Sequence, residues 1–299
     1  MEITKFIDCH THVNFAAFKD DYKETIARAY EAGVFLVNVG TQKDTSRRAV
    51  EMAHEFPNGV YATVGVHPIH TDKSHHDADE LGATDEAVGF TSREEEFDYE
   101  YYKKLAMDDR VVAIGECGID LYRIENQKSK ITKQRDVFEK HIELAREVKK
   151  PLMIHCRSGA PERASPQNVA GREAYGELTE ILNSNVKTLN NPSGIIHFFC
   201  GAKEEARKLL DLGFYFTFGG VVTFSRDYDE VVKYIPMERI LSETDAPYVT
   251  PVPYRGKRNE PTYVVEVVKK LAELKGVSLD EMKSWIWGNV HYVLTNIPF

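Results

Sequence analysis

The chain of 299 residues is short of cysteine and has no long apolar run. No run approaches the roughly 20 apolar residues that a membrane helix needs, and the start "MEITKF" lacks the basic and apolar parts of a signal peptide. A disulfide framework is not expected and a reducing compartment fits, because no CxxC pair occurs among Cys9, Cys117, Cys156 and Cys200. We therefore expect a cytoplasmic protein with neither a membrane nor an obligate protein partner.

Positive charge is outnumbered, since 38 Lys and Arg residues against 47 Asp and Glu residues give a formal net charge of −9. This argues against a protein that coats nucleic acid through a broad basic surface, because such binding depends on many Lys and Arg contacts to phosphate. A small local basic site stays compatible, and some carboxylates could offset bound cations. With 42% hydrophobic and 28% charged residues, the composition is that of a globular protein with a sizeable core.

Short apolar runs alternate with segments of helical spacing along the whole chain. Strand followed by helix, repeated eight times, indicates parallel strands with crossover helices. The sequence predicts a closed (β/α)8 TIM barrel, with a doubly wound open sheet as the alternative. No linker divides the chain, so a single domain over 1–299 is expected. The expected strands cover residues 6–10, 34–40, 60–66, 111–116, 151–156, 194–199, 214–220 and 239–245.

Two polar segments, 68–104 and 157–172, are too long for plain connections. They follow the third and fifth expected strands, so we interpret them as insertions at the rim where barrel active sites lie. The other interpretation, a partly disordered solvated loop, applies equally to residues 70–96.

Histidines and carboxylates gather at the ends of the expected strands. Polar groups are costly in apolar strands unless they are paired or bind a metal, and imidazole with carboxylate suits Zn²⁺ and other divalent ions. Because side chains alternate along a strand, both histidines of "DCHTH" point the same way and can bind one ion. Taken singly, each residue could instead be a core histidine or part of a salt bridge. The set is His10, His12, His67, Glu116, His155, His197 and Asp245.

The other histidines and the cysteines are assigned plainer roles. His54, His141 and His291 lie in helical patterns and are interpreted as structural. The histidines of the first insertion are expected to be solvated: His70, His75 and His76. Three cysteines adjoin expected ligands and should therefore face the helix layer, namely Cys9, Cys117 and Cys156, whereas Cys200 is left unassigned.

Six motifs in this order resemble the TatD-type metal-dependent deoxyribonucleases of the amidohydrolase superfamily: "DCHTH", "GVHP", "AIGECGID", "MIHCR", "IHFFCG" and "SETDAPY". The resemblance covers essentially the whole chain and implies a two-metal barrel enzyme. His10 and His12 would hold the first ion, which Asp245 would also contact. His155 and His197 would hold the second ion, and Glu116 would bridge both. The metal could be Zn²⁺, Mg²⁺ or Mn²⁺.

The resemblance also implies roles in catalysis. A metal-bridging hydroxide would attack the phosphodiester of a free 3′ end of a DNA strand, expected to be single-stranded, with Asp245 as general base and Glu116 holding the ions. His67 would face the substrate. Arg157, on the same side as His155, is a candidate phosphate contact. A nucleic-acid backbone could also lie along the loop that carries Arg255, Lys257 and Arg258, although a solvated charged loop is an equal alternative.

Rival functions stay open at this point. The same scaffold could hydrolyse an ester, amide or lactone bond, including the ester of an aminoacyl-tRNA, because fold does not fix substrate. A non-catalytic metal-binding protein is the remaining alternative. The chain departs from the family pattern at Leu121, Phe198 and Cys200 without losing a ligand, and the long insertions could reshape substrate access.

Overall fold

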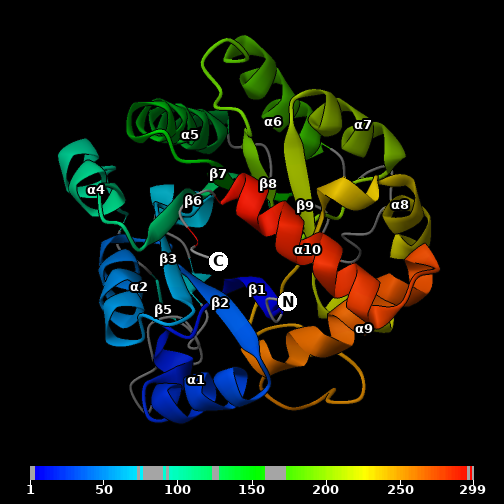
Figure 1. Cartoon of the computed structure of the whole chain (residues 1–299). Helices are drawn as coiled ribbons and strands as arrows, with labels where there is room; N and C mark the ends of the chain where they lie inside the picture. Colours follow the sequence, from blue (N-terminus) through cyan, green and yellow to red (C-terminus); the bar gives the residue numbers. More distant parts are fainter. Residues whose placement is uncertain are drawn as a thin grey trace.

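Eight parallel strands form one sheet, ordered as in the sequence (Figure 1). The computed structural model describes residues 4–72, 75–76, 90–91, 94–122, 128–158, 173–294 and 297. The strands are β1 (Phe6–Thr11), β2 (Val34–Val39), β3 (Val60–Val64), β6 (Val111–Asp120), β7 (Leu152–Arg157), β8 (Gly194–Ile196), β9 (Phe214–Phe218) and β10 (Ile240–Ser242).

The last strand returns to the first, which makes the sheet a barrel. The Asp245 amide donates to the His10 carbonyl at 2.9 Å, and the His12 amide donates to the Ala246 carbonyl at 2.8 Å. A side chain adds to this seam, since the Ser242 hydroxyl donates to the Ile7 carbonyl at 2.8 Å. The predicted barrel is confirmed, and the open sheet is excluded.

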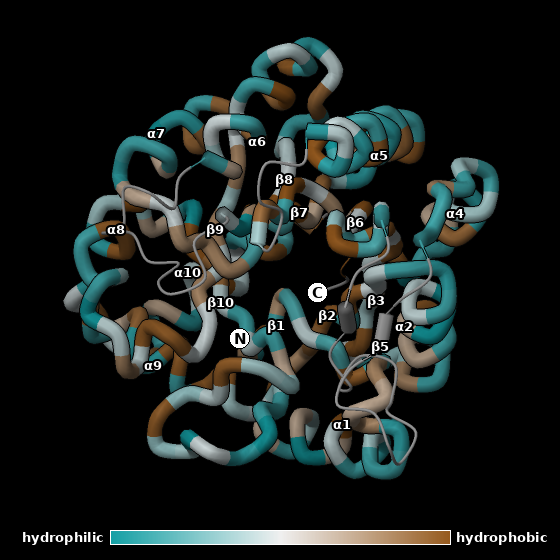
Figure 2. The backbone as a smooth tube through the Cα atoms, turned by 180° about the vertical axis from the view of Figure 1, so that it is seen from behind, coloured by the Kyte–Doolittle hydropathy of each residue, from teal (hydrophilic) through white to brown (hydrophobic). Residues whose placement is uncertain are grey.

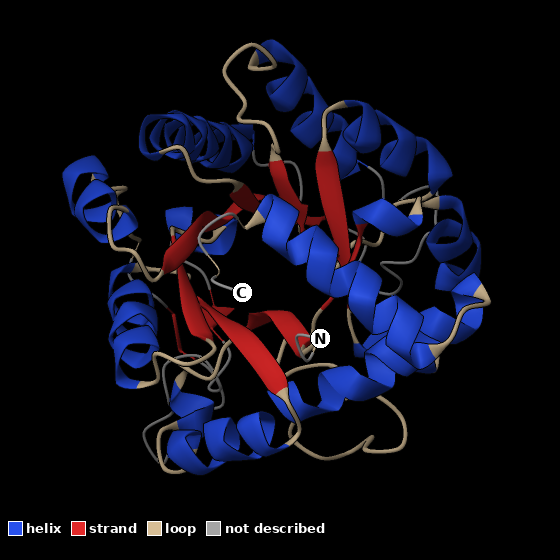
Figure 3. Ribbon diagram, in the orientation of Figure 1, coloured by secondary structure: helices blue, strands red, loops and turns tan. Residues whose placement is uncertain are grey.

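Helices surround the strands on the outside (Figure 3). They bury their apolar faces against the sheet, and the strands are mostly hydrophobic while the outer turns are mostly hydrophilic (Figure 2). The helices are α1 (Tyr22–Glu31), α2 (Lys43–Glu55), α4 (Tyr99–Ala106), α5 (Lys128–Val148), α6 (Glu173–Ser184), α7 (Lys203–Asp211), α8 (Asp229–Tyr234), α9 (Val264–Lys275) and α10 (Leu279–Val293).

Helix α10 packs at the end of the barrel where the strands begin. The side-chain amide of Asn289 donates to the backbone carbonyls of Met237 and Ile240, both at 2.9 Å. Met237 lies just before β10, and Ile240 is its first residue. The opposite end, where the strands finish, is therefore the end available for a site. Within the described ranges, no helix is both long enough and apolar enough to cross a membrane.

The first expected insertion is shorter than predicted. Its end, residues 99–104, belongs to α4, which joins the outer ring next to β3 and β6. The Asp98 carboxylate accepts from the Tyr101 amide at 3.1 Å and caps this helix. The remainder includes a 3-10 helix, η2 (Pro68–Thr71), and a small antiparallel pair of β4 (His75–His76) and β5 (Phe90–Thr91). Residues 159–172 of the second expected insertion lie outside the described residues.

One histidine of the first insertion corrects the prediction. His70 was expected to be solvated, but it is fully buried, because η2 turns the chain back toward the barrel and brings its ring beside His67. The side chains of His75 and His76 lie outside the described part of the chain.

The cysteines pack as the alternation of side chains predicts. Cys9, Cys117 and Cys156 are free thiols buried in the hydrophobic core. Burial raises the pKa of each of these thiols, so they are poor nucleophiles and poor ligands. Cys200 lies beside the Tyr175 hydroxyl, with the two heteroatoms 3.5 Å apart.

His141 is a buried neutral ring that ties α5 to the segment after β3. Its Nδ1 donates to the Val137 carbonyl at 2.7 Å, and its Nε2 accepts from the Val66 amide at 3.0 Å. Both contacts need the neutral form, and burial lowers the pKa of His141 to about 4. The sequence-based assignment of a structural role agrees with this geometry.

We predict that His141 contributes a measurable acid sensitivity to folding. Since the folded-state pKa is below the ordinary value, the contribution to stability is complete above pH 6.5 and is lost as the pH falls toward 4. By pH 5 the loss is about 2 kcal/mol. Urea unfolding in chelator at pH 5 and 7.5 should show a smaller pH effect in His141→Gln than in the parent chain. An equal pH effect in both proteins would contradict the assignment.

Candidate metal centre

One group of ligand atoms forms where β1 and β10 end. The Nε2 atoms of His10 and His12 lie 3.1 Å apart, so the two side chains do point the same way. Asp245 Oδ1 lies 3.7 Å from His10 Nε2 and 3.4 Å from His12 Nε2. Glu116 Oε2 from β6 lies 3.4 Å from His10 Nε2 and 3.8 Å from His12 Nε2. The expected meeting of both histidines with Glu116 and Asp245 is confirmed.

A second group uses the other oxygen of the same carboxylate. Glu116 Oε1 lies 2.9 Å from His155 Nδ1 and 3.0 Å from His197 Nε2. These two histidine nitrogens are 3.3 Å apart. Glu116, which is almost fully buried, therefore stands between the two groups with one oxygen in each.

A glycine allows β6 and β7 to bring their side chains together. Gly118 has a φ of +137°, and a Cβ on it would lie 2.1 Å from the His155 carbonyl oxygen. Only glycine fits such close backbone contact with that positive φ. This position therefore helps set the distance between Glu116 and His155.

Oxygen atoms behind three of the histidines leave the other ring nitrogen of each facing the two groups. His12 Nδ1 contacts the Val39 carbonyl at 3.0 Å, and His155 Nε2 contacts Asp120 Oδ2 at 2.9 Å. His197 Nδ1 lies 3.4 Å from Glu243 Oε2. Because these oxygens only accept, each neutral ring carries its proton on that side and turns a lone pair toward the group. Histidine nitrogen lone pairs and carboxylate oxygens that lie this close together form a site that suits a divalent cation.

The sequence reasoning missed Asp120 and Glu243, although a signal was present. Asp120 follows Glu116 at an even spacing on one strand, and Glu243 stands two residues before Asp245. Even spacing places side chains on the same face of an extended chain. The Tyr122 amide donates to Asp120 at 2.7 Å, and the Thr217 hydroxyl donates to Glu243 at 2.6 Å, so both carboxylates are held in place.

Burial and the surrounding charges shift the pKa values of the cluster in opposite directions. Burial alone would raise the pKa of Glu116, but the charges of His67, His197 and His10 outweigh it and hold that pKa well below its usual range. Burial lowers the pKa of His67 to about 4. Burial opposes protonation of His197, yet Glu116 and Glu243 raise its pKa well above the usual value. These shifts describe the protein groups without bound cations.

His67 lies at the edge of the cluster. Its Nδ1 accepts from the Ile69 amide at 3.1 Å, so the neutral ring carries its proton on Nε2. That Nε2 lies 3.2 Å from Glu116 Oε1. A ring fixed in this tautomer offers a proton donor, which is consistent with the expectation that His67 faces a substrate.

The two predicted arginine contacts lie in different settings. Arg157 is exposed at the end of β7, with its guanidinium 3.8 Å above the Tyr122 ring. Arg258 is already engaged by Asp21 through a 2.9 Å hydrogen bond and a 2.5 Å ion pair, and it donates to the Ala17 carbonyl at 2.6 Å. This pairing gives Arg258 a role in holding its loop, and its substrate contact stays a prediction.

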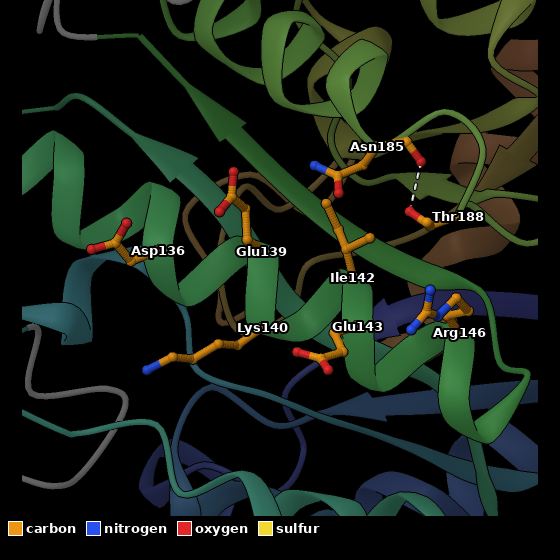
Figure 4. Close-up of a pocket in the computed structure, with 8 residues that line it drawn as sticks. All are labelled: Asp136, Glu139, Lys140, Ile142, Glu143, Arg146, Asn185 and Thr188. Atoms are coloured by element: carbon orange, nitrogen blue, oxygen red, sulfur yellow. Dashed lines mark hydrogen bonds between the residues drawn. The ribbon is translucent and has the colours of Figure 1, made fainter.

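A groove on the outer surface lies apart from this cluster (Figure 4). It has a volume of about 550 Å³ and lies along α5 and the chain after α6. Acidic and basic side chains are mixed along it, and it shares no residue with the histidine cluster. Its lining residues are Asp136, Glu139, Lys140, Ile142, Glu143, Arg146, Asn185 and Thr188.

Comparison with known proteins agrees with the motifs and the barrel. A family model described as TatD related DNase matches residues 7–295. The chain belongs to this TatD family. It is 37% identical over 280 residues to YabD of Bacillus subtilis, covering 93% of this chain and 94% of YabD. It is 31% identical over 282 residues to YcfH of Escherichia coli, covering 92% of this chain and 90% of YcfH. Both relatives are named uncharacterized metal-dependent hydrolases, and the TatD protein described here is a metal-dependent hydrolase of the same family.

Solved structures of TatD proteins share the fold. The TatD homologue YjjV of Escherichia coli superimposes with a TM-score of 0.77 at 24% identity. The superposition covers 99% of this chain and 100% of YjjV. A TatD family hydrolase of Entamoeba histolytica gives a TM-score of 0.74 at 20% identity. The superposition covers 99% of this chain and 100% of the Entamoeba protein. At these identities the likeness establishes the barrel alone.

We predict that substitutions at the cluster separate two metal-binding events. Glu116→Ala should weaken both, because one oxygen of Glu116 faces each group. Asp245→Ala should weaken one event and His155→Ala the other, since Asp245 Oδ1 lies with His10 and His12 whereas His155 Nδ1 lies with His197. Calorimetric titration of the chelated protein with Zn²⁺ or Mn²⁺ measures this. Loss of only one event in Glu116→Ala would contradict the shared carboxylate.

We also predict that the supporting carboxylates strengthen metal binding without touching the metal. Asp120→Ala and Glu243→Ala should each lower affinity by about 10- to 100-fold, because His155 and His197 lose the acceptors that fix their tautomers. Asp120→Asn and Glu243→Gln should recover part of the affinity. Asp98→Ala, which removes the cap of α4, is the control and should leave affinity unchanged. Unchanged affinity in both alanine variants would refute the role.

Proposed function

We propose that this TatD protein is a two-metal deoxyribonuclease that cleaves phosphodiester bonds from a free 3′ strand end. The observation that carries the proposal is the Glu116 carboxylate, whose two oxygens each join a separate group of histidine nitrogens. Paired divalent ions, when bound, polarise a phosphodiester and activate water for in-line attack. The description of the matching family, TatD related DNase, supports this substrate class.

Asp245 is the general base of the proposed reaction. Its side chain is 17% exposed, whereas that of Glu116 is 4% exposed, so water reaches Asp245 more readily. Its Oδ1 lies in the group with His10 and His12 and can accept a proton there. The water oxygen then bonds to phosphorus, the P–O bond to the strand breaks, and the leaving oxygen takes up a proton.

His67 and Arg157 bind the phosphate in this proposal. His67 presents its Nε2 proton at the edge of the cluster, where it can be donated to a phosphate oxygen. Arg157 is exposed at the end of β7, two residues after His155, and its planar guanidinium suits phosphate oxygens. With a net charge of −9 over the whole chain, a local contact of this kind favours capture of a strand end over coating of a duplex.

The proposal is tested with single-stranded DNA labelled at either end, with and without chelator. We expect metal-dependent release of nucleotides from the 3′ end, and a loss of at least about 100-fold in kcat in Asp245→Ala. An ester and lactone panel, with an aminoacyl-tRNA, is assayed in parallel. Turnover of that panel without nucleotide release would replace the nuclease by a hydrolase of another ester. Retention of turnover by Asp245→Ala would refute the assigned base.

For Arg157 we predict a loss of affinity for the phosphate. Arg157→Ala should raise KM for the oligonucleotide about tenfold with a smaller effect on kcat, because a contact made before and during reaction is removed. Arg157→Lys should recover part of the loss. Steady-state kinetics at two salt concentrations provide the measurement. A change confined to kcat would assign Arg157 to the reacting atoms.

A further inference from the structure

We propose that the loops after β9 and β10 form a platform for the bases and phosphates of single-stranded nucleic acid beside the metal centre. The platform consists of two pairs, each with a cation over an aromatic ring: Arg255 on Phe224, and Lys257 on Tyr254. This inference rests on the proposed function and extends it from the reacting phosphate to the neighbouring nucleotides.

The first pair joins the two loops. The Arg255 guanidinium lies 4.2 Å from the centre of the Phe224 ring. The loops are fastened together at this point, because the Val252 amide donates to the Thr223 hydroxyl at 2.9 Å. Arg255 also donates to the Thr250 carbonyl at 2.8 Å. Phe224 is still 44% exposed, so a large apolar ring faces solvent while its partner cation is already positioned.

The second pair lies on the same β10 loop. Lys257 Nζ lies 5.8 Å from the centre of the Tyr254 ring, and Tyr254 is stacked on Tyr263 with ring centroids 4.0 Å apart. The Thr250 hydroxyl donates to the Lys257 carbonyl at 2.6 Å. Hydrogen bonds within the β10 loop thus fix the backbone that carries Tyr254, Arg255 and Lys257 before any ligand arrives.

The β10 loop starts and ends beside the metal centre. Asp245 belongs to the first ligand group, and the loop returns at Asn259, whose side chain donates to the Thr244 carbonyl at 2.9 Å. The backbone N–H of Asn259 also donates to the Pro247 carbonyl at 3.1 Å. Arg255 is four residues from Asn259, so their Cα atoms are at most about 14 Å apart. A strand with its reacting phosphate at Asp245 can therefore reach the platform.

Charge and ring chemistry select the occupant. Arg255 and Lys257 are exposed, and neither forms an ion pair with a carboxylate in the part of the chain that the structure describes. The exposed Phe224 ring and the partly buried Tyr254 ring, each with an available cation, match alternating bases and phosphates. Bases stack on aromatic side chains, and phosphates contact the cations. A duplex keeps its bases stacked on each other, so the platform favours a single strand.

The test measures binding separately from cleavage. In an Asp245→Ala background that blocks turnover, a fluorescent single-stranded 12-mer is titrated with Mn²⁺ present. Adding Phe224→Ala should raise Kd at least about fivefold, Phe224→Trp should not, and Arg255→Ala should raise Kd and flatten its salt dependence. Tyr292, an exposed ring on α10 at the other end of the barrel, provides the matched control, and Tyr292→Ala should leave Kd unchanged.

A cleavage assay then separates the platform from the proposed function. In the otherwise unaltered enzyme, Phe224→Ala should lower kcat/KM for the 12-mer and spare bis(p-nitrophenyl) phosphate, which is too small to reach the platform. If the parent enzyme cleaves DNA and Phe224→Ala cleaves and binds equally well, the platform is refuted and the nuclease stands. Equal loss on both substrates also refutes the platform. If the parent neither binds nor cleaves the 12-mer, both proposals fail.

Discussion

The site depends on one buried carboxylate that serves two groups of histidines. Glu116 is almost fully buried, and its two oxygens contact nitrogen atoms delivered by β1, β7 and β8. A lone carboxylate in this position would be strongly destabilising, because burial removes its hydration. Facing histidines lower that cost, and cations between the groups would lower it further. The barrel therefore has to place these strand ends accurately for Glu116 to be tolerated at all.

A second layer of polar contacts makes that placement possible. Asp120 and the Val39 carbonyl each accept from the back of one histidine, and Glu243 lies 3.4 Å from Nδ1 of His197, so the rings cannot rotate freely. At the seam of the barrel, the Thr244 amide donates to Asp8 at 2.8 Å and ties β10 to β1. The structural and chemical networks are thus continuous, because the contacts that close the barrel also position the ligand groups.

The rim around this centre carries cations that lie over aromatic rings. The chain as a whole is acidic, yet exposed cations lie over aromatic rings at the end of β7 and on the loops after β9 and β10. The histidine cluster fits metal-assisted hydrolysis in general, whereas the rim decides which molecules can approach it. A local concentration of positive groups on an acidic protein suits a flexible anionic ligand that enters by one end.

The sequence by itself determined the strand order, the candidate ligand residues and the burial of Cys9, because alternation along a strand and polar residues at strand ends are local signals. The even spacing of Asp120 was equally readable, though it was not used. Only the tertiary structure decided which oxygen of Glu116 faces which histidines and that Arg258 is paired with Asp21. It also decided that His70 is buried. These features depend on barrel closure and on contacts between distant segments, which no local pattern encodes.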